Sequence, residues 1–255
     1  TFGFPVWLRA QDPYLSKGGV AHDGEVATRL GLPAIPVIAE TIALNTIVTL
    51  AERHGARVHL CRLSSADGVA IVKQAKARGI PVTCDVAVHH LHLSEVDIGY
   101  FDSNCHLIPP LRGVRDRDAL REAVREGTID AICSDHTPVD DDAKQVPFAE
   151  AEPGASALEL LLPLTLKWAA DARVPLPQAL ARITCDAARV LGIDAGHLSP
   201  GHSADVCVFD PLTSWKIEAR SLKSQGKNTP FIGYELQGKV CFSIVNGHSV
   251  FEARG

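Results

Sequence analysis

The sequence contains no methionine and few aromatic side chains. Aromatic residues fill 5% of the 255 positions, and position 1 is a threonine. We therefore expect the chain to start inside a longer reading frame, or to lack residues that the natural protein carries. Hydrophobic residues nevertheless make up 46% of the chain. This is enough for a large core, and it excludes disorder, collagen and a small disulfide scaffold.

Long apolar runs and basic runs are also missing. No window approaches the ~18 consecutive apolar residues that a membrane span needs, and residues 1–10 lack the features of a secretory signal. Lys and Arg number 25 against 30 Asp and Glu, which gives a net charge of −5. No cluster of basic residues is long enough to neutralise a stretch of phosphates. We expect a cytoplasmic protein that binds neither nucleic acid nor a membrane.

The cysteines form no Cys-x-x-Cys pair, and their number is odd. Many of them lie inside apolar runs, so we interpret them as buried, reduced thiols in preference to a disulfide or zinc framework. The seven are Cys61, Cys84, Cys105, Cys133, Cys185, Cys207 and Cys241.

Short apolar runs alternate with amphipathic segments over much of the chain. The strands that we expect are residues 4–8, 57–62, 81–88 and 129–134, and the helices between them are residues 39–54, 67–78 and 116–126. Continuous apolar strands separated by helices indicate βαβ units and a parallel sheet buried on both faces. The pattern is typical of an α/β barrel or an open doubly wound sheet.

The last third of the sequence changes character. Residues 158–170 and 177–191 have helical periodicity, whereas residues 204–211 and 239–247 have the composition of strands. Asn246-Gly247 is a strong turn signal. We therefore predict a small β-rich appendage from about residue 198.

Polar side chains follow the expected strands directly. They include Arg9, Arg62 and the segment Ser134-Asp135-His136. Active sites of α/β barrels lie at this rim of the sheet. An Asp at the end of a buried strand can serve as a ligand or base, and it can equally serve as a helix N-cap. The residue pattern alone leaves both interpretations of Asp135 open.

A histidine cluster follows the third expected strand. Period two in a strand would put His90 and His92 on one face and His89 on the other, so no two of them form an automatic pair of metal ligands. Histidines in such loops are more often solvated or hydrogen-bonded, and the cluster alone does not favour a metal site.

Several independent motifs, spread over residues 8–250, resemble those of the dihydroorotases, which belong to the amidohydrolase superfamily of metal-dependent barrels. They are Arg57–Ser65, Thr83–Leu93, Pro109–Arg112, Gly127–Pro138, Lys144–Gly154, Ser203–Pro211, Gly226–Pro230 and Gly238–Val240. The resemblance implies a (β/α)₈ barrel of the TIM type with an attached small β-domain. It also implies two zinc ions at the barrel mouth, where a bridging hydroxide attacks a cyclic amide and interconverts dihydroorotate and carbamoyl aspartate.

The resemblance places this chain in the second half of such a barrel. Residues 1–197 correspond to strands 5 to 8 with their helices, and residues 198–255 correspond to the C-terminal part of the small β-domain. The zinc-binding His-x-His pair of the first strand and the carboxylate of the fourth strand have no counterpart in these 255 residues.

The departures from the family pattern affect the zinc ligands. Arg9 and Arg62 stand where the family has the metal-binding histidines of its fifth and sixth strands, and only the eighth-strand aspartate is kept, as Asp135. Two substrate contacts are replaced as well, by Ile108 and Val139. A guanidinium about 4 Å from Zn²⁺ would be repelled by roughly 8 kcal/mol at an effective dielectric constant of 20, and Arg cannot lose its proton. We therefore expect no ordinary dinuclear zinc site and no cofactor.

Three functional hypotheses follow. The first is an inactive dihydroorotase-like protein that forms an oligomer and acts as a structural partner of aspartate transcarbamoylase. Its Asp135 would be vestigial, and Arg9, Arg62 and His136 would be the residues available to bind a substrate-like molecule. The second is an active zinc dihydroorotase with rearranged ligands, for which His59, His89 and His136 are nearest in sequence. The third is a sensor of an anionic pyrimidine precursor.

One geometric expectation accompanies these hypotheses. An ionised carboxylate at the end of a buried strand needs a cationic partner when no metal neutralises it. We predict that Arg9 or Arg62 places its guanidinium within hydrogen-bonding distance of Asp135, because a guanidinium offers two donors to one carboxylate.

Overall fold

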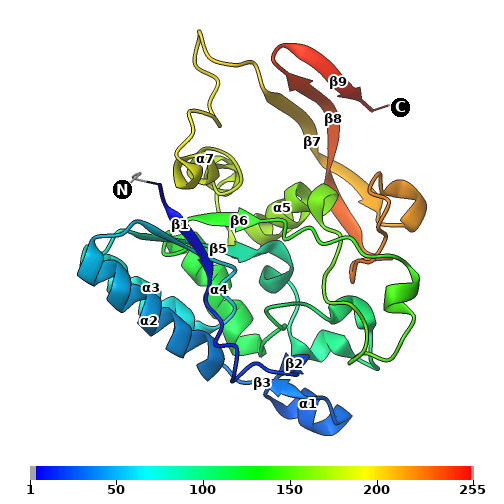
Figure 1. Cartoon of the computed structure of the whole chain (residues 1–255). Coiled ribbons are helices and arrows are strands. Elements are labelled where there is room, and N and C mark those ends of the chain that lie inside the picture. Colours follow the sequence, from blue (N-terminus) through cyan, green and yellow to red (C-terminus); the bar gives the residue numbers. More distant parts are fainter. Residues whose placement is uncertain (1–3, 254–255) are drawn as a thin grey trace.

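A four-stranded parallel sheet organises the first two thirds of the chain (Figure 1). The computed structural model describes residues 4–253. The strands lie in the order β1 (Val6–Arg9), β4 (Val58–Cys61), β5 (Val82–Ala87) and β6 (Ala131–Cys133), and each neighbouring pair is parallel. All four predicted strands are therefore confirmed, and each predicted end lies within two residues of the observed one.

Three helices connect and cover these strands (Figure 1). They are α2 (Ile38–His54), α3 (Ala66–Ala77) and α4 (Val114–Glu126), and they agree with the predicted helices. Helix α2 ends at Gly55, whose φ of 61° suits a residue without a side chain. Helix α3 begins where the Ser65 side chain accepts a hydrogen bond from the N–H of Gly68.

The strand register separates the two faces of the sheet. Leu60 pairs with Cys84, and both are fully buried beneath the helices. His59 pairs with Thr83, so their side chains share the opposite face with those of Cys61 and Asp85. The sheet therefore has one apolar face, which includes the buried thiol of Cys84, and one face that carries His59, Cys61, Thr83 and Asp85.

Helix α5 (Leu161–Ala172) follows as predicted, but the single helix expected over residues 177–191 is wrong. The structure has α6 (Leu176–Ala181) and α7 (Cys185–Leu191) instead. The N–H groups of Ile183 and Thr184 bond three residues back, to Leu180 and Ala181, and Thr184 then leaves helical geometry with ψ of −101°. These hydrogen bonds of the 3₁₀ type end α6, and the non-helical backbone of Thr184 sets the direction of α7.

Residues 17–36 contain one short helix and one small parallel pair of strands. The shorter elements of the chain are β2 (Ala21–His22), α1 (Glu25–Leu30), β3 (Ala34–Ile35), and the 3₁₀ helices η1 (Val88–Leu91), η2 (Glu95–Ile98), η3 (Ser103–Cys105), η4 (Asp142–Lys144), η5 (Leu158–Leu160) and η6 (Ala219–Ser221). The histidine cluster thus begins in a 3₁₀ helix, so the strand periodicity considered for it does not apply.

An antiparallel sheet completes the chain. It consists of β7 (Val206–Lys216), β8 (Glu235–Val245) and β9 (His248–Glu252). Asn246 and Gly247 join β8 to β9 with φ values of 49° and 78°, which is the geometry of a type I′ turn. The β-rich appendage is confirmed, although its third strand was not predicted.

The two sheets share one hydrophobic core. Ile217 and Phe231, which lie in the segment between β7 and β8, are buried with Leu164 and Trp168 of α5. The division into two domains after residue 197 stays a prediction. Within residues 4–253, every helix falls short of the length or the apolar character that a membrane crossing requires.

Candidate functional site

An ion pair joins the carboxyl ends of β4 and β6. Nη1 of Arg62 donates a hydrogen bond to Oδ1 of Asp135 over 2.6 Å. The side chains of Arg62 and Asp135 are 27% and 13% exposed, so water screens this pair only in part. The predicted contact between a strand-end arginine and Asp135 is present.

Both members of the ion pair have unusual backbone geometry. Arg62 has a φ of 59° and Asp135 a φ of 45°, in the left-handed region that residues with a side chain rarely adopt. Such a conformation costs of order 1 kcal/mol per residue and occurs preferentially at functional sites. The N–H of Arg62 is held at 2.7 Å by Oδ1 of Asp85, which fixes the bend at the end of β4.

Arg9 occupies the next strand end, because it pairs with Cys61 in the register of β1 and β4. Among residues 4–253, its guanidinium makes no hydrogen bond or ion pair. Burial and the neighbouring charge of Arg62 lower the pKa of Arg9, while Asp135 opposes this shift. The rim therefore brings two guanidinium groups near one carboxylate, and that carboxylate is bonded to Arg62.

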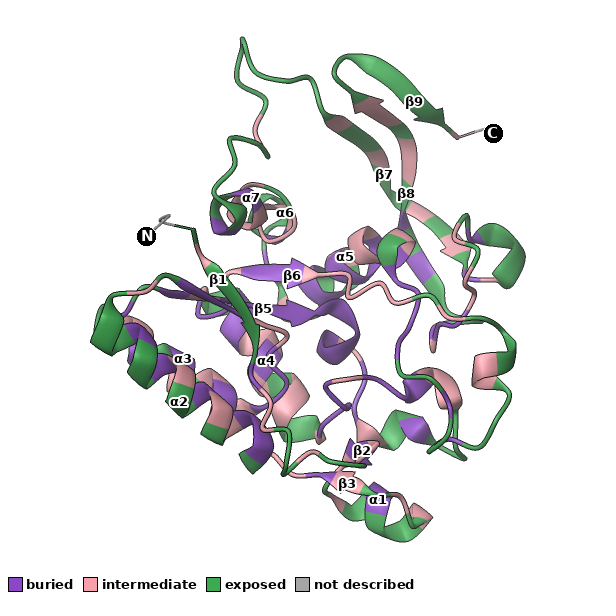
Figure 2. Ribbon diagram, viewed as in Figure 1, coloured by how far each residue is buried: buried purple, intermediate pink, exposed green. Residues whose placement is uncertain are grey.

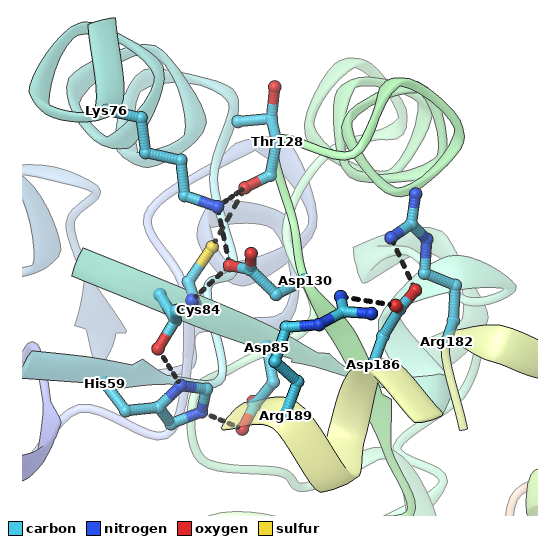
Figure 3. Close-up of polar contacts among 10 residues, drawn as sticks. His59, Lys76, Cys84, Asp85, Thr128, Asp130, Arg182, Asp186 and Arg189 are labelled. Carbon is cyan, nitrogen blue, oxygen red and sulfur yellow. Dashed lines mark hydrogen bonds and ion pairs between the residues drawn. The ribbon is translucent and has the colours of Figure 1, made fainter. Parts of the chain in front are cut away.

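Asp85 lies beneath this pair and was missed by the sequence reasoning. Its carboxylate contacts Nε2 of His59 at 2.9 Å (Figure 3). It also accepts the N–H of Arg62 at 2.7 Å and a weak bond from the thiol of Cys133 at 3.5 Å. A proton on Nε2 of His59 satisfies this contact and leaves Nδ1 to accept from the hydroxyl of Thr83 at 2.9 Å. The available signal was a carboxylate inside an apolar strand, because such a group is almost never buried without a partner.

Potential metal donors meet at two places in the described part of the chain. The ligand atoms of His59, Cys61 and Asp85 lie within 4.8 Å of one another on the polar face of the sheet. The second group, Asp194, His197 and His202, is on the surface loop between α7 and β7. Imidazole, thiolate and carboxylate are donors typical of zinc sites.

His136 and His89 do not join His59. Nδ1 of His136 accepts backbone N–H groups from Ala157 and Leu158 at 3.1 and 3.3 Å, which ties the end of β6 to the segment before α5. His89 is fully buried, and neither ring nitrogen has a hydrogen-bond partner among residues 4–253. The three histidines considered as substitute ligands are therefore spread over separate sites.

The histidine cluster itself packs into the core. Nε2 of His90 donates to the carbonyl of Pro109 at 3.1 Å, and Nε2 of His92 donates to that of Leu164 at 2.9 Å. Burial lowers the pKa of His89 to about 3 and that of His90 and of His92 to about 4. These rings are neutral structural groups near pH 7.

Comparison with known proteins places the chain in a family. The model of the amidohydrolase family matches residues 17–250. The chain belongs to the amidohydrolase family. A dihydroorotase-like protein of Pseudomonas aeruginosa is 46% identical over 252 residues, and one of Pseudomonas putida is 44% identical over 248. A dihydroorotase of a Geobacter species is 40% identical over 251 residues. The resemblance to dihydroorotases is confirmed.

The chain spans only part of the length of its relatives. In these three comparisons the aligned region takes in 97–99% of this chain but only 58–59% of each relative. L-Hydantoinase from Arthrobacter aurescens superimposes with a TM-score of 0.88 at 24% identity, over 98% of this chain and 57% of that one. Dihydropyrimidinase from Brevibacillus agri gives 0.84 at 21% identity, with the same shares covered. These structural matches confirm the amidohydrolase TIM-barrel fold.

Proposed function

We propose that the protein is an inactive dihydroorotase-like member of the pyrimidine biosynthesis machinery that acts as a structural partner of aspartate transcarbamoylase. The observation that carries the proposal is the 2.6 Å ion pair between Arg62 and Asp135. Asp135 is the one carboxylate that matches a zinc ligand of the family, and a guanidinium is bonded to it.

The residues at this rim do not fit a dinuclear zinc centre. A guanidinium has no lone pair to offer a metal, and it keeps its positive charge at any pH at which the protein folds. Arg9 and Arg62 both lie where the family places histidine ligands, so their combined charge opposes a dication there. No hydrolytic step through zinc is therefore assigned to Asp135.

The proposed partnership rests on the family resemblance and on the relatives. The resemblance to the dihydroorotases implies association with aspartate transcarbamoylase. Two relatives that match nearly the whole chain are named dihydroorotase-like proteins. Retention of the fold without the metal ligands is what selection for assembly would produce. We place the complex in the cytoplasm and expect the protein to be oligomeric in it.

The decisive experiment uses the natural full-length protein. Aspartate transcarbamoylase from the same organism should co-purify with it, and dihydroorotate hydrolysis should stay at the level of a protein-free blank with added zinc. Two bound zinc ions per chain together with ring hydrolysis would overturn the proposal, as would failure of the two proteins to associate. The variant Arg9→His/Arg62→His should bind more zinc than the parent, because it restores two imidazole donors at the rim.

A second candidate is an active zinc amidohydrolase with rearranged ligands. The convergence of His59, Cys61 and Asp85 within 4.8 Å favours it. In that case hydrolysis of dihydroorotate would be zinc-dependent and would fall on Cys61→Ser, while Cys207→Ser, at an exposed thiol of the antiparallel sheet, would keep full activity. Absence of turnover in the parent protein rejects this candidate.

A further inference from the structure

We propose that Asp194, His197 and His202 form a binding site for one zinc ion, or a similar divalent transition-metal ion, on the loop between α7 and β7. The ligand atoms of the three residues lie within 4.8 Å of one another. Figure 1 shows this loop, in yellow, rising from α7 away from the parallel sheet before it reaches β7. One ion here is therefore compatible with the loss of zinc ligands at the strand-end rim.

The spacing of the donor atoms suits a tetrahedral ion. Nε2 of His197 lies 2.9 Å from Oδ1 of Asp194, and Nδ1 of His202 lies 3.2 Å from Oδ2 of the same carboxylate. Zinc–nitrogen bonds of ~2.0–2.1 Å at tetrahedral angles place neighbouring donor atoms about 3.3 Å apart. The two imidazole rings meet edge to face, with centroids 4.3 Å apart, so they do not stack on each other. The three donors therefore need only small movements to surround one ion.

Both ends of the loop are fixed by the rest of the chain. Gly196 has a φ of 81°, and a Cβ atom there would lie 2.6 Å from the backbone nitrogen of Cys185 at the start of α7. At the other end, the carboxylate of Asp205 accepts the N–H of Asn246 in the turn between β8 and β9 at 2.8 Å. The donors are thus carried on an anchored backbone. An ion would close the connection between α7 and the antiparallel sheet over residues 194–202.

The donor set selects the class of metal. Two imidazoles and one carboxylate are typical of zinc and related ions, whereas magnesium and calcium prefer oxygen ligands alone. The side chain of Asp194 is 74% exposed, so an ion can reach it from solvent and keep water as a fourth ligand. Exposed ion pairs contribute little to stability, so the pairs themselves do not explain why two histidines converge on one aspartate.

Metal binding also sets the tautomer of His197. An imidazole that binds a metal through Nε2 carries its proton on Nδ1. That nitrogen now accepts a long contact of 3.4 Å from the N–H of Ser199. Binding would break this contact, which is at the outer limit of a hydrogen bond and therefore contributes little.

The test is titration of the metal-free 255-residue chain with cobalt(II), which occupies zinc sites and reports its ligands in the absorption spectrum. We expect one ion per chain, without the thiolate-to-cobalt charge-transfer band that a cysteine ligand produces. Zinc should displace the cobalt, and excess magnesium should not. A charge-transfer band that disappears in Cys61→Ser would assign the ion to the parallel sheet and overturn the proposal. Displacement by magnesium would overturn the class of metal, and absence of saturable binding would reject the site.

Two variants locate the ion. His197→Gln and His202→Gln should each raise the dissociation constant for cobalt at least tenfold, because each removes one of three protein ligands. His54→Gln is the matched control, since His54 is exposed at the end of α2. If both site variants bind cobalt as tightly as this control, the proposal is wrong. Far-ultraviolet circular dichroism verifies that each variant is folded.

Limited proteolysis measures the closure of the loop. Zinc should slow cleavage within residues 192–205 of the parent chain and leave cleavage of His202→Gln unchanged. Equal protection of the parent and the variant would contradict the role of His202. Neither experiment depends on hydrolysis or on association with aspartate transcarbamoylase, so their outcome is independent of the proposed function.

Discussion

Arg62 and Asp135 each hold a left-handed backbone, and their side chains meet at 2.6 Å across the ends of β4 and β6. The two strained residues therefore constrain one another, since the ion pair needs both side chains directed over the same rim. Asp85 contributes from below by accepting the N–H of Arg62. Strain of this kind persists only where surrounding contacts over-determine it.

Replacing Arg62 by alanine should destabilise the protein. Asp135 would lose the guanidinium that is bonded to it, at a site where its side chain is 13% exposed. We expect a loss of about 1–3 kcal/mol in the free energy of unfolding at pH 7, measured by urea denaturation. The control is Arg115→Ala, whose pair with Asp67 is exposed and should change stability by no more than about 0.5 kcal/mol. Equal effects of the two variants would contradict a structural role for the Arg62 pair.

The buried histidines predict instability in acid. Burial lowers the pKa of His89 to about 3 and that of His90 and of His92 to about 4, whereas an unfolded chain protonates histidine near pH 6.5. The unfolded state therefore binds more protons below about pH 6.5. The stability from neutral burial is complete above that pH, and it falls as the pH drops toward 4, by up to about 1.4 kcal/mol per pH unit for each ring.

The variant His89→Leu isolates one of these rings. Since His89 makes no hydrogen bond within residues 4–253, leucine removes a proton-binding group without removing a polar contact. The slope of unfolding free energy against pH between 6.5 and 4.5 should decrease relative to the parent. His248→Gln, at an exposed position on β9, should leave the slope unchanged. An unaltered slope in His89→Leu would contradict the assignment.

Phe231 connects the antiparallel part to the histidine cluster. Its ring is 1% exposed and lies 6.2 Å from that of His89 and 5.4 Å from that of Tyr234, measured between ring centroids. Phe231→Ala should cost about 3–5 kcal/mol of stability through the cavity that it leaves. The better hydrated His89 should also titrate at a higher pKa, which NMR detects. Phe251→Ala, at an exposed position on β9, should cost much less.

Asp130 joins α3 to the centre of the sheet (Figure 3). Its Oδ2 accepts from Nζ of Lys76 at 2.6 Å and from the backbone N–H of Cys84 at 2.8 Å. Asp130→Ala should lower the unfolding free energy by about 1–3 kcal/mol, because the N–H of Cys84 loses its acceptor and Lys76 keeps only its bond to the carbonyl of Thr128. Asp130→Asn keeps an amide oxygen and should cost less. If asparagine and alanine are equally destabilising in thermal unfolding, the backbone contact is not the source of stability.

The sequence allowed the parallel sheet to be predicted because its strands are short apolar runs separated by helical segments. Burial on both faces was wrong for β1, all four residues of which are exposed. The strand-end positions and the family resemblance together predicted that Arg9 or Arg62 would meet Asp135, and Arg62 does so. The Asp85 contacts could not be predicted, because they depend on the register that places His59 beside Thr83. The break between α6 and α7 was not predicted, because the sequence pattern does not show it. Residues 177–191 keep helical periodicity across Ile183 and Thr184, and only the backbone geometry shows the turn.

The outer strand β1 of the parallel sheet has consequences for handling the chain in solution. Within residues 4–253, β1 pairs only with β4, and Val6, Trp7 and Leu8 on β1 are all exposed (Figure 2). A free edge with apolar side chains is a template on which another polypeptide can add a strand. Self-association of this chain should therefore rise with concentration and weaken when a charged residue replaces Trp7. Concentration itself thus becomes a variable to control in every measurement described above.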